Sequence, residues 1–264
     1  MLALKIVLAP GLVVVASLVE RRFGSRVGGL FAALPIVAGP ILLFYAKEQG
    51  VGFAAGAAAS TLLGLVSLTA FVVVYASFAG RVGYAVALAS GWGAFLVSTA
   101  LLSTLRVPPV AALIIAVAAF SIALLVLPRF PATEDSQVIR RPSWDLPLRA
   151  GAALALVLVL TFAASSLGPR LGGLLTPFPV VASVLAAFTH VQGGNAAVQQ
   201  LLRGLVVGFF AFALFCFVLA IALRPDGILV AFAFAAVAAL SLQAVVLRVS
   251  HGRAMAVESN TPLP

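Results

Sequence analysis

The sequence contains few residues of the kinds that carry chemistry. Its 264 residues include one cysteine, two histidines and seven acidic residues, and only 9% are charged. A single cysteine excludes a disulfide framework and a zinc site built from cysteine. The chain also has no His-Glu-x-x-His motif, no Gly-x-Ser-x-Gly motif and no pair of acids placed for acid–base catalysis. These absences argue against an enzyme, and they indicate no metal and no cofactor.

Long apolar runs dominate instead. Hydrophobic residues make up 63% of the chain and the mean hydropathy is +1.22, which excludes an ordinary soluble domain. A helix needs roughly 20 apolar residues to cross ~30 Å of hydrocarbon, and the runs lack the alternation of barrel strands. We therefore predict an all-α polytopic membrane protein with about nine spans, at residues 2–20, 27–46, 51–79, 82–105, 107–128, 148–168, 171–191, 196–223 and 227–248.

The basic residues lie singly between these runs, so the net charge of +9 bears on orientation and not on nucleic acid. An external N-terminus puts the larger share of the basic residues on the inner side. This favours a multi-pass protein, in contact with the lipid bilayer, with its N-terminus outside and its C-terminus in the cytoplasm. The orientation requires an odd number of spans. Residues 107–128, which follow Arg106-Val-Pro-Pro, either cross the membrane or form a re-entrant bend.

One motif occurs twice, 144 residues apart. Residues 24–39 read GSRVGGLFAALPIVAG and residues 168–183 read GPRLGGLLTPFPVVAS, and the same offset pairs Gly50 with Gly194. Chance matches of Leu and Ala are common in an apolar chain, but a matched frame of Gly, Arg and Pro is not. The pattern predicts two related halves, and paired halves interrupted by Pro and Gly point to a transporter. The repeat motif comprises Arg26, Arg170, Gly28, Gly29, Gly172 and Gly173.

A hydrophilic segment separates the two halves. We expect a first transmembrane repeat at 1–128, a cytoplasmic connector at 129–147, a second repeat at 148–248 and a disordered tail at 249–264. Equivalent spans of the two halves lie five crossings apart. The two pseudo-symmetric repeats are therefore inverted if residues 107–128 cross the membrane, and parallel if they do not.

Small residues four apart recur in both halves. This spacing lets helix backbones approach closely in lipid, so we expect Gly24/Gly28, Gly52/Gly56 and Gly204/Gly208 to pack helices together. The matched arginines of the motif either snorkel to the interface or mark a functional position.

A proline lies about nine residues into the second and the seventh span. Pro35 and Pro179 each remove a hydrogen-bond donor and free a carbonyl, which is tolerated at membrane depth where it lines protein or a water-filled cavity. Thr176 is available to bond such a carbonyl. Either each proline merely kinks its helix, or the two broken spans form a binding site between them.

Polar residues between the seventh and eighth spans break the symmetry of the halves. Asn195, Gln199 and Arg203 are spaced by four and share a helical face. Arg203 lies about two turns inside its span, where a charge costs several kcal/mol. It either snorkels with Gln199 as its cap or binds an anionic group. The candidate substrate-binding residues are Arg203, Gln199, Gln200, His190, Asn195, Pro35, Pro179 and Thr176.

The acidic residues all lie at span edges, in loops or in the tail. We therefore expect no buried carboxylate, and hence neither a proton relay nor a cation site made from one.

The second copy, GGLLTPFPVVASVLAAFTHV followed by a Gly-Gly turn, resembles the GlpM-like family of small bacterial inner-membrane proteins. The resemblance implies a duplicated and fused version of a unit of about four spans, located in the bacterial inner membrane. Members of that family are linked to exopolysaccharide production. The residues that carry the resemblance are Gly173, Leu174, Pro177, Phe178, Pro179, Ala187 and His190.

Together these patterns predict a transporter of a small anionic or phosphate-bearing solute, which could be lipid-linked, with its site between the second and seventh spans. The alternative is a non-catalytic membrane subunit that supports envelope or exopolysaccharide assembly. A homodimer is compatible with either function.

Overall fold

The computed structural model describes residues 2–128, 144–174, 178–224 and 227–258, with the backbone alone for 2–6, 160–174 and 249–258. All secondary structure in these ranges is helical, as predicted. The helices are α1 (Leu2–Phe23), α2 (Ser25–Ala32), α3 (Ala38–Glu48), α4 (Val51–Ala79), α5 (Tyr84–Leu102), α6 (Pro109–Val126), α7 (Asp145–Leu174), α8 (Val180–Ala222) and α9 (Ile228–Glu258).

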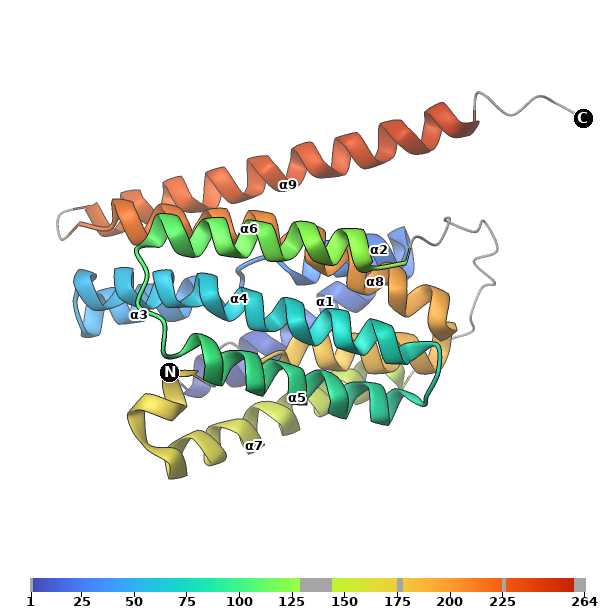
Figure 1. Cartoon of the computed structure of the whole chain (residues 1–264), viewed down its shortest axis with the longest axis horizontal. Coiled ribbons are helices and arrows are strands. Elements are labelled where there is room, and N and C mark those ends of the chain that lie inside the picture. Colours follow the sequence, from blue (N-terminus) through green and yellow to red (C-terminus); the bar gives the residue numbers. More distant parts are fainter. Residues whose placement is uncertain (1, 129–143, 175–177, 225–226, 259–264) are drawn as a thin grey trace, which may run out of the picture.

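Within the described residues, five helices are long and apolar enough to cross a membrane: α4, α5, α6, α8 and α9. They run roughly along the long axis of the molecule, with α9 at one edge and α7 at the opposite edge (Figure 1). Pro109 occupies the first turn of α6, where its fixed φ favours helix initiation. The 18 residues of α6 form one uninterrupted helix. Residues 107–128, for which the sequence allowed either a span or a re-entrant bend, therefore contain a helix with the length and composition of a span.

The interruption expected at each proline is present. The first lies between the end of α2 at Ala32 and the start of α3 at Ala38, with Pro35 inside it. The second contains Phe178 and Pro179, which lie outside a helix directly before α8, and Pro179 is the N-cap of α8.

Glycines with positive φ reverse the chain at two positions that are 144 residues apart. Gly50 has a φ of 89° directly before α4, and Gly194 has a φ of 69° inside α8. Side chains with a Cβ rarely adopt this conformation. Gly194 divides α8 into a first arm, residues 180–193, and a second arm, residues 195–222. Because Pro179 and Phe209 line the same cavity, the second arm runs back alongside the first.

Helix α2 and the second arm of α8 cross with their backbones in close contact, which glycines at the crossing allow. A Cβ on Gly29 would collide with the carbonyl oxygen of Leu201, and one on Gly204 would collide with that of Arg26. A Cβ on Gly208 would lie 2.5 Å from the Cβ of Ala33. The predicted close packing is therefore present at the Gly204/Gly208 pair, and small residues let these backbones meet.

Three boundaries differ from the prediction. Helix α7 continues to Leu174, past the predicted end of the sixth span at 168 and the predicted start of the seventh at 171. Helix α7 begins at Asp145, inside the segment that we assigned to the connector, because Asp145 is held by a buried side-chain network. Helix α9 continues to Glu258, ten residues past the predicted start of a disordered tail, through residues such as Ala254, Met255 and Ala256 that favour helix.

Candidate functional site

A large cavity of about 750 Å³ lies between the two proline interruptions. Leu34, Val37 and Ala38 line it from the first interruption, and Phe178 and Pro179 line it from the second. The neighbouring walls come from α4, from the end of α5 and from the second arm of α8. This volume lies in the range of pockets that hold small organic ligands. The cavity occupies the region where the sequence predicts a site between the broken spans.

The walls of the large cavity differ in polarity. Apolar side chains line it from α1, α3 and the second arm of α8, with Leu12, Ile41 and Phe209 as examples. Helices α4 and α5 contribute most of the polar groups instead. These are Ser60, Thr61 and Ser67 on α4, and Thr99, Ser103 and Arg106 on α5 and the segment that follows it.

Two of these hydroxyl groups are unusual. Ser67 is fully buried and Thr99 is 9% exposed, and neither hydroxyl has a hydrogen-bond partner among the residues that the structure describes. A buried polar group without a partner carries a desolvation cost. Helical serines and threonines normally bond the carbonyl four residues back. That bond is present in this chain at Ser60, Thr61, Thr69, Ser77 and Ser121.

Gly52 and Gly56 do not pack helices together, contrary to our prediction. A Cβ at either position would meet no atom of the described residues within 4 Å. Both glycines line the large cavity and are exposed. Their spacing therefore keeps space open on one face of α4, because a larger side chain would extend into it.

The predicted polar residues of α8 lie elsewhere. Gln199 donates to the carbonyl of Ala76 (2.6 Å) and to Oδ1 of Asn195 (3.3 Å). His190 Nδ1 lies 3.2 Å from the hydroxyl of Tyr75. Gln200 is half-buried in the same helix. Gln199 and His190 thus join α8 to the C-terminal part of α4, and none of these residues lines the large cavity.

Arg203 contacts backbone. Its Nη1 donates to the carbonyl oxygens of Leu124 and Leu127, each at 3.0 Å. These carbonyls lie at the C-terminal end of α6, where four such groups lack partners within the helix and a cation is favoured. The guanidinium therefore stabilises the end of α6.

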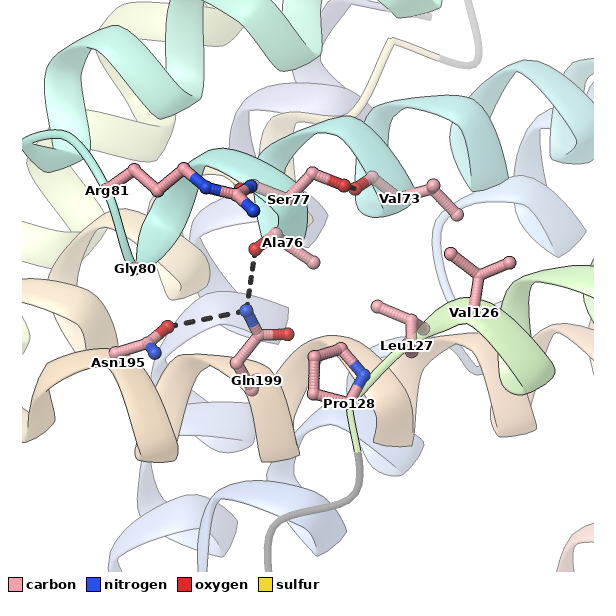
Figure 2. Close-up of a pocket in the computed structure, with 10 residues that line it drawn as sticks. All are labelled: Val73, Ala76, Ser77, Gly80, Arg81, Val126, Leu127, Pro128, Asn195 and Gln199. Atoms are coloured by element: carbon pink, nitrogen blue, oxygen red, sulfur yellow. Dashed lines mark hydrogen bonds between the residues drawn. The ribbon is translucent and has the colours of Figure 1, made fainter.

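A smaller pocket of about 370 Å³ lies beside this group, between α4, the end of α6 and the second arm of α8. Figure 2 shows Asn195 and Gln199 pointing toward α4. Arg81 lies along α4 and donates to the carbonyl of Ser77 at 2.7 Å (Figure 2). Of the predicted substrate-binding residues, Asn195 and Gln199 line the small pocket and Pro179 lines the large cavity.

A buried ion cluster, which the sequence did not predict, joins α1, α7 and the first arm of α8. Arg149 has no exposed surface and pairs with Glu20 (3.2 Å) and with Asp145 (3.1 Å). Arg21 forms a second ion pair with Asp145. We call Glu20, Arg21, Asp145 and Arg149 the ion cluster; its four charges sum to zero.

Neutral side chains complete the hydrogen bonding of the ion cluster. Ser17 accepts from Arg149 (3.2 Å), and Thr189 donates to Glu20 (2.8 Å). Gln192 accepts from Arg149 (3.0 Å) and donates to Asp145. The Arg149 guanidinium also lies 5.1 Å from the centre of the Phe188 ring, within the range of a cation–π contact.

Glu20 and Asp145 correct our expectation that no carboxylate is buried, since they are 2% and 0% exposed. Burial raises the pKa of Asp145, but the hydrogen bonds from Gln192, Arg21 and Arg149 outweigh it, so the pKa lies below the usual value for aspartate. Asp145 is therefore ionised at neutral pH. Both residues lie at helix ends in the sequence, so only their partners on other helices reveal the burial.

The remaining predicted residues form two groups: those whose side chains the structure describes and those whose side chains lie outside the described part. Pro35 lies half-buried in the first interruption, and Arg26 is exposed in the first turn of α2. Gly28 packs on α1, where a Cβ would lie 2.6 Å from that of Glu20. The predictions for Arg170, Gly172, Gly173 and Thr176 lie outside the residues whose side chains the structure describes.

The composition and the apolar helices define an α-helical membrane protein. Comparisons of the chain with protein-family models, with curated proteins and with solved structures find no match. Among the described residues, no three histidine, cysteine, aspartate or glutamate side chains gather in a way that could hold a metal ion.

Proposed function

We propose that this protein is a bacterial inner-membrane transporter and that the large cavity holds its substrate. The observation that carries the proposal is the position of this cavity, which is bounded by both proline interruptions. Interrupted helices in matching places of two halves are typical of substrate sites in secondary transporters. The substrate is an anionic or phosphate-bearing solute, lipid-linked or otherwise amphipathic, because most of the lining is apolar.

An inverted repeat of nine spans is part of this proposal. Its support is that Gly50 and Gly194 share positive φ at equivalent positions, and that each precedes a long helical segment. These two segments, α4 and the second arm of α8, run in opposite directions. The late residue Ala76 of α4 meets Gln199, which lies early in the second arm. Opposite directions are what an inverted repeat requires, because its equivalent helices cross the membrane in opposite senses.

Transport also needs a barrier between the cavity and one face of the membrane, and we assign this role to the ion cluster. Three helices contribute to both regions. On α8, for example, Ala182 lines the large cavity and Thr189, seven residues later, bonds Glu20. Seven residues span about 10 Å at ~1.5 Å per residue. Because the ion cluster holds α1, α7 and the first arm of α8 together, its separation would open the cavity toward that side.

The proposal can be tested without knowing the substrate. A cysteine at Gly56 replaces an exposed cavity residue, and Cys216, which is fully buried, can be replaced by alanine to give a clean background. In membrane vesicles of both orientations, an impermeant thiol reagent should label Gly56→Cys from either face, since a transporter exposes its site to each side in turn. Gly93→Cys, on α5 and away from the cavity, is the control for leakage of the reagent.

Labelling of Gly56→Cys from one face only would favour the second function, a non-catalytic subunit for envelope assembly, because such a subunit needs no alternation of access. Labelling of Gly93→Cys from both faces would show that the reagent crosses the membrane, and the assay would then be repeated with a larger reagent.

A further inference from the structure

Ser67 and Thr99 belong to the polar face of the large cavity, which α4 and α5 provide. Both side chains are at least nine-tenths buried, both line the large cavity, and neither hydroxyl has a partner among the described residues. Their neighbours Ser60 and Thr61 line the same cavity but donate to their own helix, at 2.9 Å each. The pair therefore has two hydrogen-bond donors that no described residue uses, and a ligand in the cavity would reach them by a small shift of the side chains that cover them.

The polar face continues toward solvent along α5. Thr99, Ser103 and Arg106 are spaced by four and three residues, and all three line the cavity. Arg106 is exposed just beyond the end of α5, so its charge lies at the mouth. A ligand entering here would meet a cation first and the buried hydroxyls further in.

The wall formed by α1, α3 and the second arm of α8 is mainly apolar, with the hydroxyl of Tyr45 as its polar group. Leu12, Ile41 and Phe209 are buried there and offer no hydrogen bond from their side chains. A fully polar solute would lose its hydration against this wall without compensation. A cationic ligand would meet Arg106 at the mouth, and no acidic side chain is found among the described residues that line the cavity.

We propose that the large cavity binds a single-chain amphipathic anion, with its charged head between Arg106 and the hydroxyls of Ser67 and Thr99 and its apolar chain against α1, α3 and α8. This inference rests on the proposed function and specifies the substrate class of the same site. Hydroxyl donors and a guanidinium make their strongest hydrogen bonds to phosphate or carboxylate oxygens. A hydrocarbon chain gains from burial on the apolar wall in proportion to its area.

The experiment measures equilibrium binding of radiolabelled decyl phosphate to the protein in lipid nanodiscs. Decyltrimethylammonium, which has the same chain and the opposite charge, should compete at least tenfold less well than unlabelled decyl phosphate. The double variant Ser67→Ala/Thr99→Val should weaken binding at least tenfold. Its matched control is Ser121→Ala/Thr69→Val, which makes the same changes at hydroxyls that lie outside the large cavity and already bond their own helix, and which should stay within twofold of the wild type.

Three results would overturn the inference: no saturable binding of decyl phosphate, equal competition by the cation, or equal effects of the two double variants. The variant Gly56→Phe distinguishes a failure of this inference from a failure of the proposed function. If Gly56→Phe abolishes binding while Ser67→Ala/Thr99→Val does not change it, the cavity remains the site and only the assignment of the head group is wrong. If Gly56→Phe leaves binding unchanged, decyl phosphate does not bind in the cavity, and the proposed function loses its site.

Discussion

The large cavity and the buried ion cluster lie on the same helices and are opposite in character. In the cavity, the hydroxyls of Ser67 and Thr99 have no partner among the residues that the structure describes, and space stays open at Gly56. The ion cluster buries Arg149 completely and surrounds it with two carboxylates and several hydrogen-bonding side chains. The cavity therefore contains open space and hydroxyls without a described partner, whereas the ion cluster is buried and its Arg149 is hydrogen-bonded on several sides. The difference suggests that the first is built for a ligand and the second for holding helices together.

The largest expected effect concerns Arg149. Its replacement by methionine leaves Glu20 without its ion pair to Arg149 and removes one of the two arginines that pair with Asp145. Removing one partner of a buried ion pair costs about 3–5 kcal/mol. We expect Arg149→Met to lower the midpoint of thermal unfolding strongly, measured by loss of the monodisperse peak in size-exclusion chromatography after heating.

The matched variant is Glu20→Gln/Asp145→Asn/Arg149→Met, which removes the buried charges together. We expect it to recover part of the stability lost in Arg149→Met, because no isolated carboxylate remains buried. If the triple variant is less stable than Arg149→Met alone, the three side chains do not act as one electrostatic unit.

A smaller effect is expected for Gln192→Leu. This change removes one hydrogen bond to Arg149 and one to Asp145, while the ion pairs between the helices remain. A loss of about 1–3 kcal/mol follows from groups left partly unsatisfied. Because the ion cluster is the proposed barrier, Gln192→Leu should also raise the rate at which Gly56→Cys is labelled from the cluster side. An unchanged labelling rate would mean that the ion cluster does not control access to the cavity.

The pH dependence of stability should reveal the contribution of the ion cluster through Asp145. The pKa of Asp145 is lowered in the folded protein, so its contribution is present above the unfolded value of about 3.9 and is lost as the pH falls through the folded value. The difference in unfolding midpoint between the wild type and Asp145→Asn should therefore be constant near neutral pH. It should shrink by a few degrees below about pH 4. A gap that widens in acid would contradict the lowered pKa.

The smallest effect on stability is expected in the cavity. Gly56→Leu adds a side chain where a Cβ meets no described atom within 4 Å, and leucine favours helix by roughly 1 kcal/mol over glycine. We expect an unfolding midpoint equal to or slightly above that of the wild type, together with weaker binding of decyl phosphate. A large loss of stability would mean that the space at Gly56 is needed for folding.

The sequence predicted the parts of the fold that depend on local patterns. Apolar runs predicted the helices, and Pro35 and Pro179 predicted the two interruptions, because a proline acts on its own backbone wherever it lies. The sequence paired Gly50 with Gly194, and both have positive φ, as Gly24 also has; the conformation itself was not predicted. These features need no knowledge of tertiary partners.

The features that the sequence missed depend on partners far along the chain. Glu20 and Arg149 are separated by 129 residues, and each lies near a helix end where a charge is normally solvated. The sequence left open whether Arg203 snorkels or binds an anion, and it could not show that the guanidinium donates to the carbonyl of Leu124 on another helix. Ser67 and Thr99 resemble ordinary helical hydroxyls until the absence of their usual backbone bonds distinguishes them.

The most direct test of the central claim is transport itself, measured as uptake of radiolabelled decyl phosphate into proteoliposomes. The account predicts saturable uptake by the wild type, uptake within twofold of it by Gly93→Phe, and at least a tenfold loss in Gly56→Phe. Both variants place the same ring at a helical glycine with open space, but only Gly56 lines the cavity. Uptake no faster than in protein-free vesicles, or equal uptake by the two variants, would contradict the claim that this cavity carries an amphipathic anion across the membrane.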